Sequence, residues 1–139
     1  MNEFERLIAF FKISTENLAA LRHNVGGRGF FEAHEVLQKQ YEYVQQQVDA
    51  LAEIGIRLGY TEPSIADAVL AFQSEILPVV GRNQEQTYVE AQAILRALVG
   101  MCMNAETEAP TDVVNRLQEI EYELNHQANY LLARALIKD

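Results

Sequence analysis

The chain has 139 residues, and its 20 acidic and 11 basic side chains give it a formal net charge of -9 at pH 7. This length suits one domain that buries a core, and the acidic excess disfavours binding to nucleic acid, because phosphate contacts need clustered lysine and arginine. No apolar run has the length of a membrane span and no signal-like segment begins the sequence, so a cytoplasmic protein is expected.

A first amphipathic helix is expected over residues 2-24. Its apolar residues recur at steps of three and four: Phe4, Leu7, Ile8, Phe11, Leu18 and Leu21. Arg22 and His23 stand at its end, where cations interact favourably with the helix dipole. Glycines follow at positions 26, 27 and 29. Because no strand precedes them and no Gly-Lys-Ser/Thr follows, they predict a tight turn rather than a phosphate loop.

A longer amphipathic helix is expected over residues 30-59. Its buried stripe consists of apolar residues at helical spacing: Leu37, Tyr41, Val44, Val48, Leu51 and Leu58. Gly59 suits a left-handed cap that ends the helix. A polar stripe runs beside the apolar one, since at about 100° per residue its members fall within roughly a third of the circumference. These members are His34, Gln38, Gln45, Asp49 and Glu53.

The polar stripe carries three candidate metal ligands, His34, Asp49 and Glu53. The two acids are one turn apart, so their carboxylates can point at the same ion. His34 lies about 22 Å from Asp49 at about 1.5 Å per residue, so one chain cannot bring all three to one metal. Two copies packed antiparallel about a two-fold axis would do so, and this ligand set suits iron or zinc. The alternative is an ordinary solvated face of an amphipathic helix.

A crossover segment and a third long helix follow. A short helix is expected over residues 64-77, with Ser64 as its N-cap. The third long helix is expected over residues 83-105, where Asn83 begins a capping box. Cys102, the single cysteine, belongs to the apolar seam of this helix, so we expect a buried thiol and no intrachain disulfide.

The last helix is expected over residues 111-137, with apolar residues on one face. No strand pattern competes anywhere in the sequence. Four amphipathic helices with a long connection between the second and the third predict an all-α, ferritin-like four-helix bundle, with a short extra helix in the crossover. We expect residues 1-139 to form one such domain.

Glu123 and His126 form a Glu-x-x-His motif on the last helix, the type used inside the bundles of di-iron proteins. An intact centre of that kind needs a second such motif, and the second helix has none. The alternative, which we favour, is a solvated face to which Glu119, Glu121 and Glu123 all belong.

The motifs around the glycine turn resemble those of the Dps family of mini-ferritins. In that family the first helix ends in His-Trp-x-Val-x-Gly, followed by Phe-Phe-x-x-His and then by Asp-x-x-x-Glu. Nearly the whole chain follows the family's layout, including the short crossover helix. The residues that carry the resemblance are His23-Asn24-Val25-Gly26-Gly27, Phe30-Phe31, His34, Asp49, Glu53 and Leu58-Gly59.

The resemblance implies a homo-oligomer of two-fold dimers that assemble into a dodecameric, iron-storing shell. It also implies an inter-subunit ferroxidase centre that oxidises Fe(II), typically with hydrogen peroxide, and so protects against oxidative stress. Carried over to this sequence, the histidine of the second helix is His34, and the acids contributed by the partner are Asp49 and Glu53. Carboxylate oxygens would hold the iron while the imidazole completes a site with open positions.

Two positions depart from the family pattern. Gln38 stands where the family usually has an acidic ligand, and a neutral amide binds iron less strongly than a carboxylate. At the end of the first helix, an ungapped alignment puts Arg22 at the position of the family's histidine, whereas a one-residue deletion puts His23 there. An Arg22 guanidinium that faces the site would pair with Asp49 or Glu53 and take the place of a cation.

These departures leave two functions open. The first is iron binding, Fe(II) oxidation and iron storage at inter-subunit sites, with His34, Asp49, Glu53 and His23 as metal ligands. The alternative is a non-catalytic shell or assembly protein whose ferroxidase site has been lost. Direct DNA binding is not expected in either case, because neither end of the sequence is rich in lysine and arginine.

Overall fold

Four long helices make up most of the structure, a computed structural model in which residues 1–138 are described. They are α1, Glu3–Asn24; α2, Phe30–Arg57; α4, Gln84–Glu106; and α5, Thr111–His126. Shorter elements are α3, Ile65–Ala71; the 3₁₀ turn η1, Gln73–Glu75; the π-helical turn η2, Gln127–Leu132; and α6, Ala133–Ala135. Residues 1–138 contain one isolated β-bridge and no sheet, which confirms the all-α prediction. Within this part of the chain, no helix has both the length and the apolar character that crossing a membrane requires.

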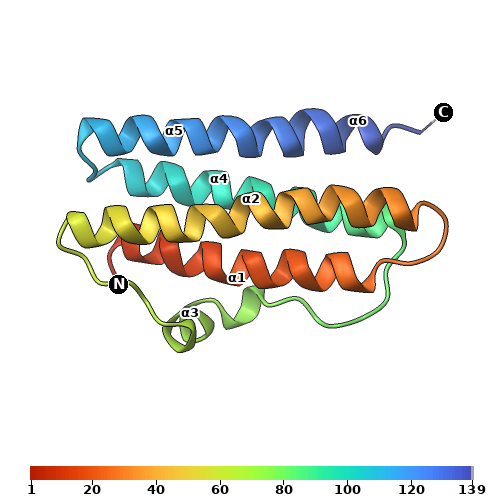
Figure 1. Cartoon of the computed structure of the whole chain (residues 1–139), viewed down its shortest axis with the longest axis horizontal. Coiled ribbons are helices and arrows are strands. Elements are labelled where there is room, and N and C mark those ends of the chain that lie inside the picture. Colours follow the sequence, from red (N-terminus) through yellow and green to blue (C-terminus); the bar gives the residue numbers. More distant parts are fainter. Residues whose placement is uncertain (139) are drawn as a thin grey trace.

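The long helices form a bundle with one long connection. In Figure 1, α1 and α2 run in opposite directions, as do α4 and α5, whereas α2 and α4 run the same way. The crossover between α2 and α4 therefore has to return along the full length of the bundle, and it carries α3 on the outside of α1. This is the connectivity of ferritin-like bundles, in agreement with the sequence prediction.

Local capping sets where several helices begin and end. The side chains of Asn2, Ser64 and Asn83 each accept a hydrogen bond from the backbone three residues on, and the side chain there returns one. Such capping boxes satisfy backbone N–H groups that the first turn leaves without partners. After α2, Gly59 has a φ of 85°, in the left-handed region that glycine adopts without strain, as predicted.

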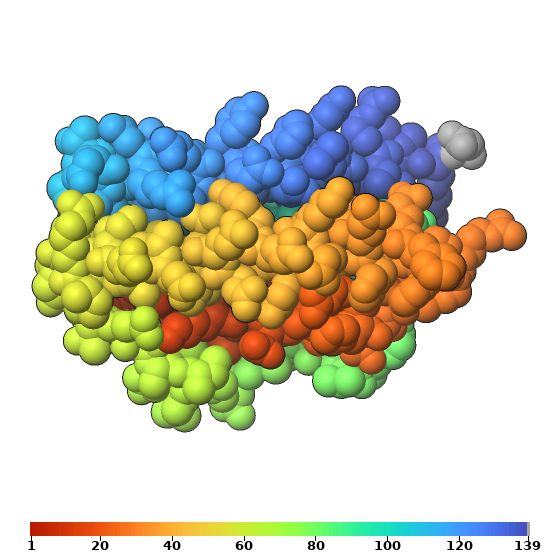
Figure 2. All heavy atoms as spheres, in the orientation of Figure 1, coloured from red at the N-terminus to blue at the C-terminus, as the bar shows by residue number. Residues whose placement is uncertain are grey.

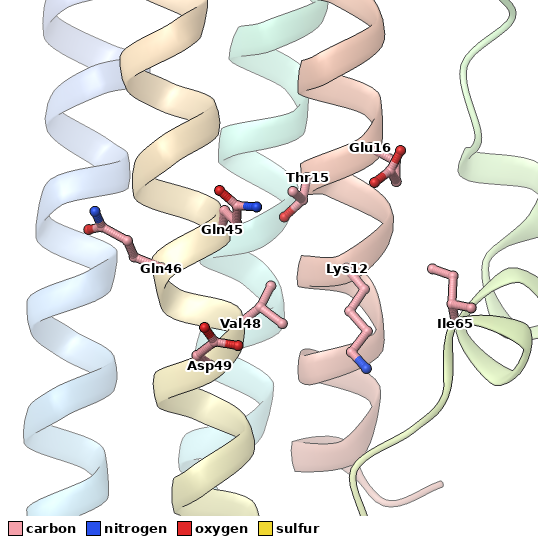
Figure 3. Close-up of a pocket in the computed structure, with 8 residues that line it drawn as sticks. All are labelled: Lys12, Thr15, Glu16, Gln45, Gln46, Val48, Asp49 and Ile65. Carbon is pink, nitrogen blue, oxygen red and sulfur yellow. The ribbon is translucent and has the colours of Figure 1, made fainter.

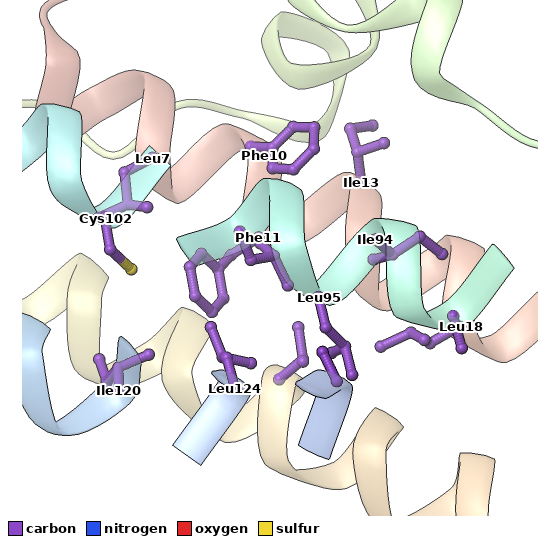
Figure 4. Close-up of a cluster of buried hydrophobic side chains, with 14 of the residues drawn as sticks. Leu7, Phe10, Phe11, Ile13, Leu18, Ile94, Leu95, Cys102, Ile120 and Leu124 are labelled. Carbon is purple, nitrogen blue, oxygen red and sulfur yellow. The ribbon is translucent and has the colours of Figure 1, made fainter. Parts of the chain in front are cut away.

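The core extends along the bundle axis, and α1 contributes to it from several faces. Leu7, Phe10 and Phe11 are all buried because α1 packs against α2, α4 and α3. Figure 4 shows Phe11 from α1 close to Leu124 from α5. Cys102 is fully buried beside them, as expected, and burial raises the pKa of its thiol. The thiol therefore acts as a small apolar group in the core.

The crossover helix is shorter than the predicted 64-77. It ends at Ala71 because Phe72 leaves helical geometry, with φ -128° and ψ 32°, and packs edge-on against Phe10 with ring centroids 5.0 Å apart. The side chain of Asn17 then accepts from the backbone N–H of Leu77 at 3.0 Å and donates to the carbonyl of Glu75 at 2.9 Å. The bond to the N–H of Leu77 replaces one that a longer helix would form internally, and the bond to Glu75 satisfies a carbonyl that such a helix would leave without a partner in its last turn.

The last helix is not the single α-helix predicted over residues 111-137. It passes through the π-helical turn η2 before the short α6. Two side chains of α4 bind this turn: the Gln92 amide donates to the carbonyl of Ala128 at 2.8 Å, and Arg96 Nε donates to Asn129 Oδ1 at 2.8 Å. A π turn shifts, by a fraction of a turn, the helix face on which the following side chains lie. The apolar periodicity of the sequence does not reveal this shift.

Candidate metal centre

One face of α2 is not covered by the rest of the bundle. Its members follow one another at steps of three and four residues, and we call the set the α2 stripe: Phe31, His34, Gln38, Glu42, Gln45, Asp49, Glu53 and Ile56. In Figure 2, α2 forms a large part of the visible surface, between α1 and α5. Phe31 and Ile56, near the two ends of the stripe, are 87% and 60% exposed. Large apolar side chains exposed on one face suggest a contact surface.

His34 is half-buried and held in one orientation. Its Nδ1 lies 3.2 Å from the carbonyl oxygen of Arg22, and its ring stacks on Phe30 with centroids 5.5 Å apart. A carbonyl oxygen can only accept, so Nδ1 is the donor, and in the neutral imidazole the lone pair is then on Nε2. This is the tautomer in which a histidine binds a metal through Nε2 while a backbone carbonyl orients the ring.

Arg22, rather than His23, is the side chain at the end of α1 that packs against the α2 stripe. Arg22 Nη1 donates to Gln38 Oε1, and its guanidinium carbon lies 4.4 Å from the centre of the Tyr41 ring. His23 is exposed, and its Nε2 accepts from Arg22 Nη2 at 3.0 Å. The arrangement agrees with the ungapped alignment, which puts Arg22 at the position of the family's histidine.

Gln38 connects this cation to an acid that the sequence did not single out. Its amide nitrogen donates to Glu42 Oε1 at 2.5 Å while its oxygen accepts from Arg22. A positive and a negative charge are therefore joined through a neutral amide next to His34. Sequence spacing does not predict this series of hydrogen bonds, because one of its three side chains, Arg22, belongs to a different helix.

Asp49 and Glu53 are exposed on the same stripe, toward the other end of α2. Asp49 borders a hollow of about 360 Å³ between α1, α2 and the crossover, which Figure 3 shows with Lys12 on its far side. Lys12 is already engaged, since its Nζ donates to Glu62 at 3.1 Å and to the carbonyl of Pro63 at 2.7 Å. Among residues 1–138, neither Asp49 nor Glu53 forms an ion pair.

The candidate ligands do not meet within one chain. No group of three histidine, cysteine, aspartate or glutamate residues in the described part of the chain is arranged to hold a metal ion. This agrees with the length argument, which separates His34 from Asp49 by about 22 Å along α2. Any site that contains His34 with Asp49 and Glu53 therefore has to include a second subunit.

The Glu-x-x-His motif of α5 makes other contacts. Glu123 accepts from the Gln127 amide at 3.0 Å. The His126 ring lies between Tyr122 and Tyr130, with centroid distances of 6.4 and 5.2 Å. The described residues bring no pair of further acids or histidines to this motif, so the intra-bundle di-iron arrangement is not assembled.

Glu121 differs from the solvated acid predicted for it. It is half-buried against α4, where its Oε2 and the Oε1 of Glu106 are both inaccessible to water and, within residues 1–138, no third group donates to them. Burial raises the pKa of the Glu121 carboxyl from 4.5 to about 7, and its hydrogen bond to Glu106 and the charge of Glu106 act in the same direction. A proton shared by the two carboxyls relieves their repulsion. Only the packing of α4 on α5 reveals the pair.

This carboxyl pair predicts that stability falls as pH rises. The folded chain binds the Glu121 proton more tightly than the unfolded chain, so the stabilisation is complete below about pH 4.5 and is lost as pH approaches and passes 7. Glu121→Gln keeps the hydrogen bond without the titration. We expect its melting temperature to exceed that of wild type by about 2 to 4 °C at pH 8 and to equal it at pH 5.

Thermal unfolding followed by circular dichroism between these two pH values measures the effect. Glu119→Gln is the matched control, because it removes the same charge from an exposed position on the same helix. Parallel pH profiles for wild type and Glu121→Gln would contradict the shared proton.

Three solved structures are similar to this chain over nearly its whole length. The antigen TpF1 of Treponema pallidum has a TM-score of 0.88 at 16% identity, covering 98% of this chain and 90% of that one. A Dps protein of Bacillus brevis has a TM-score of 0.84 at 20% identity, covering 97% and 93%. Dps of Staphylococcus aureus has a TM-score of 0.75 at 19% identity, covering 99% and 94%.

No protein family model matches the chain, and no curated protein matches its sequence. The likeness to solved structures therefore stands on backbone geometry, and at such low identity it concerns the fold. The helix order, the long crossover and the extra helix within it agree with that likeness. This chain has the ferritin-like four-helix fold of the Dps proteins.

Proposed function

We propose that this chain is the subunit of a Dps-like mini-ferritin, a cytoplasmic homo-oligomer that binds, oxidises and stores iron. The fold shared with Dps proteins and the uncovered α2 stripe support the assembly. A stripe on one helix face suits an isologous two-fold contact, in which the same surface of both subunits is buried. Dimers of this kind would join into a closed shell of the dodecameric type.

The proposed iron site lies between two subunits. His34 would supply its free Nε2, and Asp49 and Glu53 of the partner subunit would supply carboxylate oxygens. The observation that carries the proposal is this free imidazole nitrogen on the same stripe as two acids that form no ion pair within residues 1–138. Iron is the substrate there, and these ligands leave positions open for peroxide or oxygen.

A second function is favoured by one specific observation. The Arg22 guanidinium binds Gln38, the side chain one turn after His34, at a position where a further ligand would be needed. A fixed positive charge close to a metal site opposes binding of Fe(II). The second candidate is therefore the same shell without ferroxidase activity.

Anaerobic titration with Fe(II) by calorimetry, followed by peroxide while Fe(III) absorbance is recorded, tests the first function. We expect saturable binding and fast oxidation in wild type, both reduced at least about tenfold by Asp49→Asn, since a neutral amide replaces a charged ligand. Glu108→Gln is the matched control, because it removes a charge from an exposed acid far along the chain from the stripe.

The same experiment decides between the two functions. Wild type that binds no Fe(II), yet forms a large closed assembly by size-exclusion chromatography with light scattering, would establish the non-catalytic shell. A dimer that forms no larger assembly would overturn iron storage in a shell, whatever its ligands bind.

A further inference from the structure

We propose that Arg22 of each subunit binds Asp49 of the partner subunit across the two-fold axis, so that an arginine–carboxylate ion pair joins the subunits where a metal ion would otherwise do so. The inference rests on the two-fold dimer of the proposed function and favours its second candidate, the shell without ferroxidase activity, because an Asp49 that binds Arg22 does not hold Fe(II). It identifies a second copy of this chain as the occupant of the α2 stripe and Arg22 as the residue that contacts it.

The α2 stripe is complementary to itself about one point. An axis between Tyr43 and Val44 would place each member of an antiparallel copy level with a suitable partner, because the members lie at matching distances on either side of that point. The pairs are Phe31 with Ile56, His34 with Glu53, Gln38 with Asp49, and Glu42 with Gln45. In these pairs an apolar side chain lies opposite an apolar one, and each carboxylate lies opposite an amide or an imidazole. No two acids lie opposite each other, which suits an isologous contact.

Along the axis of α2, the Arg22 guanidinium lies at the height where the dimer would place Asp49 of the partner subunit. Its guanidinium binds Gln38 and lies over Tyr41, so it is located between the levels of these two residues along α2. The two-fold axis that brings His34 opposite Glu53 of the partner subunit also brings Gln38 opposite Asp49 of the partner subunit. The cation of one subunit and the carboxylate of the other therefore come to the same level on both sides of the axis.

Among residues 1–138, neither group has an oppositely charged partner in its own subunit. Within the described residues, the contacts of Arg22 are an amide, an imidazole and an aromatic ring, none of them an acid, and its Nε is buried without an acceptor. Asp49 has Lys12 across the hollow, but Lys12 is bound to Glu62 and to Pro63. A guanidinium with free donors and a carboxylate with free acceptors form a bidentate pair that ammonium groups cannot reproduce.

A charge swap tests the ion pair in the full-length protein. We expect Arg22→Glu and Asp49→Arg each to weaken dimerisation at least about tenfold, measured by sedimentation velocity over a range of protein and salt concentrations. The double variant should restore most of the loss, because the two charges are exchanged. Arg28→Glu is the matched control, since it reverses an exposed arginine in the neighbouring turn.

Several outcomes would overturn the proposal. The proposal would be contradicted if the double variant dimerised no more tightly than the weaker of the two single variants. It would also be contradicted if Arg28→Glu weakened the dimer as much as Arg22→Glu. Dissociation of the wild-type dimer by EDTA alone would show that a metal holds it. If Arg22→Glu loses its helical circular dichroism, Arg22→Gln and Asp49→Asn in a double-mutant cycle replace it, and additive losses would then contradict the pair.

The Fe(II) titration and the charge swap test two different proposals, and each proposal can fail without the other. Absence of Fe(II) binding together with a successful swap would remove the ferroxidase function and leave the ion pair. Fe(II) binding together with an unsuccessful swap would keep the ferroxidase function and remove the ion pair.

Discussion

Replacing Leu95 by alanine is expected to lower the free energy of unfolding by about 3 to 5 kcal/mol. Leu95 lies in α4 and is 1% exposed, and Figure 4 shows it among side chains of α1 and α5. Removing its terminal carbons loses their transfer free energy and leaves a cavity that helices fixed on every side cannot fill. Urea unfolding followed by circular dichroism measures the change.

Leu95→Met is the matched control for this core position. Methionine has nearly the same volume and no branch, so we expect a cost below about 1.5 kcal/mol. Both variants should be compared with wild type at equal protein concentration and in the same oligomeric state. Equal losses for alanine and methionine would show that something other than core volume decides the stability at Leu95.

Replacing Arg82 by methionine is expected to cost about 3 kcal/mol or more of unfolding free energy. Arg82 stands at the end of the crossover and is 8% exposed. Its guanidinium forms an ion pair with Glu90 and donates to the carbonyls of Val80 and Pro78 at 3.0 and 3.2 Å. Methionine would fill the space but would leave a carboxylate and two carbonyls without these donors.

The backbone of Arg82 gives this prediction a local readout. Its N–H donates to the carbonyl of Asn24 at 3.1 Å, and its carbonyl accepts from Gly26 at 2.9 Å, so it fastens the crossover to the turn between α1 and α2. We expect Arg82→Met to speed hydrogen exchange at Gly26 and to open residues 76–82 to proteolysis. Unchanged exchange at Gly26 would contradict this fastening.

Two conservative changes separate the charge of Arg82 from its shape. Arg82→Lys keeps the charge but not the planar fork that serves several acceptors, so it should recover only part of the stability. Glu90→Gln keeps an acceptor for the guanidinium and should cost less than Arg82→Met. A lysine variant as stable as wild type would show that charge alone matters at this position.

The long helices and their caps could be predicted from the sequence. Asn83, Ser64 and Gly59 act on backbone groups a few residues away, and helical periodicity reports the buried face of each helix without knowledge of its neighbours. The separation of His34 from Asp49 followed from helix geometry alone. The requirement for a second subunit in any site with these ligands was therefore already contained in the sequence.

The choice between Arg22 and His23 needed the tertiary structure. Both stand at the end of α1, and their spacing from Phe30 allowed two alignments. Contact with Gln38 and Tyr41 on α2 places Arg22 against the stripe and leaves His23 exposed. The direction of a side chain at a helix end depends on the neighbouring helix, which short-range spacing does not describe.

The sequence by itself determined the helices, their caps and the polar stripe of α2, because these depend on interactions within a few residues along the chain. Only the tertiary structure decided the raised pKa of Glu121 beside Glu106, the early end of α3 at Ala71 and the π turn after His126. In each case a side chain of another helix desolvates a group or binds a backbone group that local patterning treats as free.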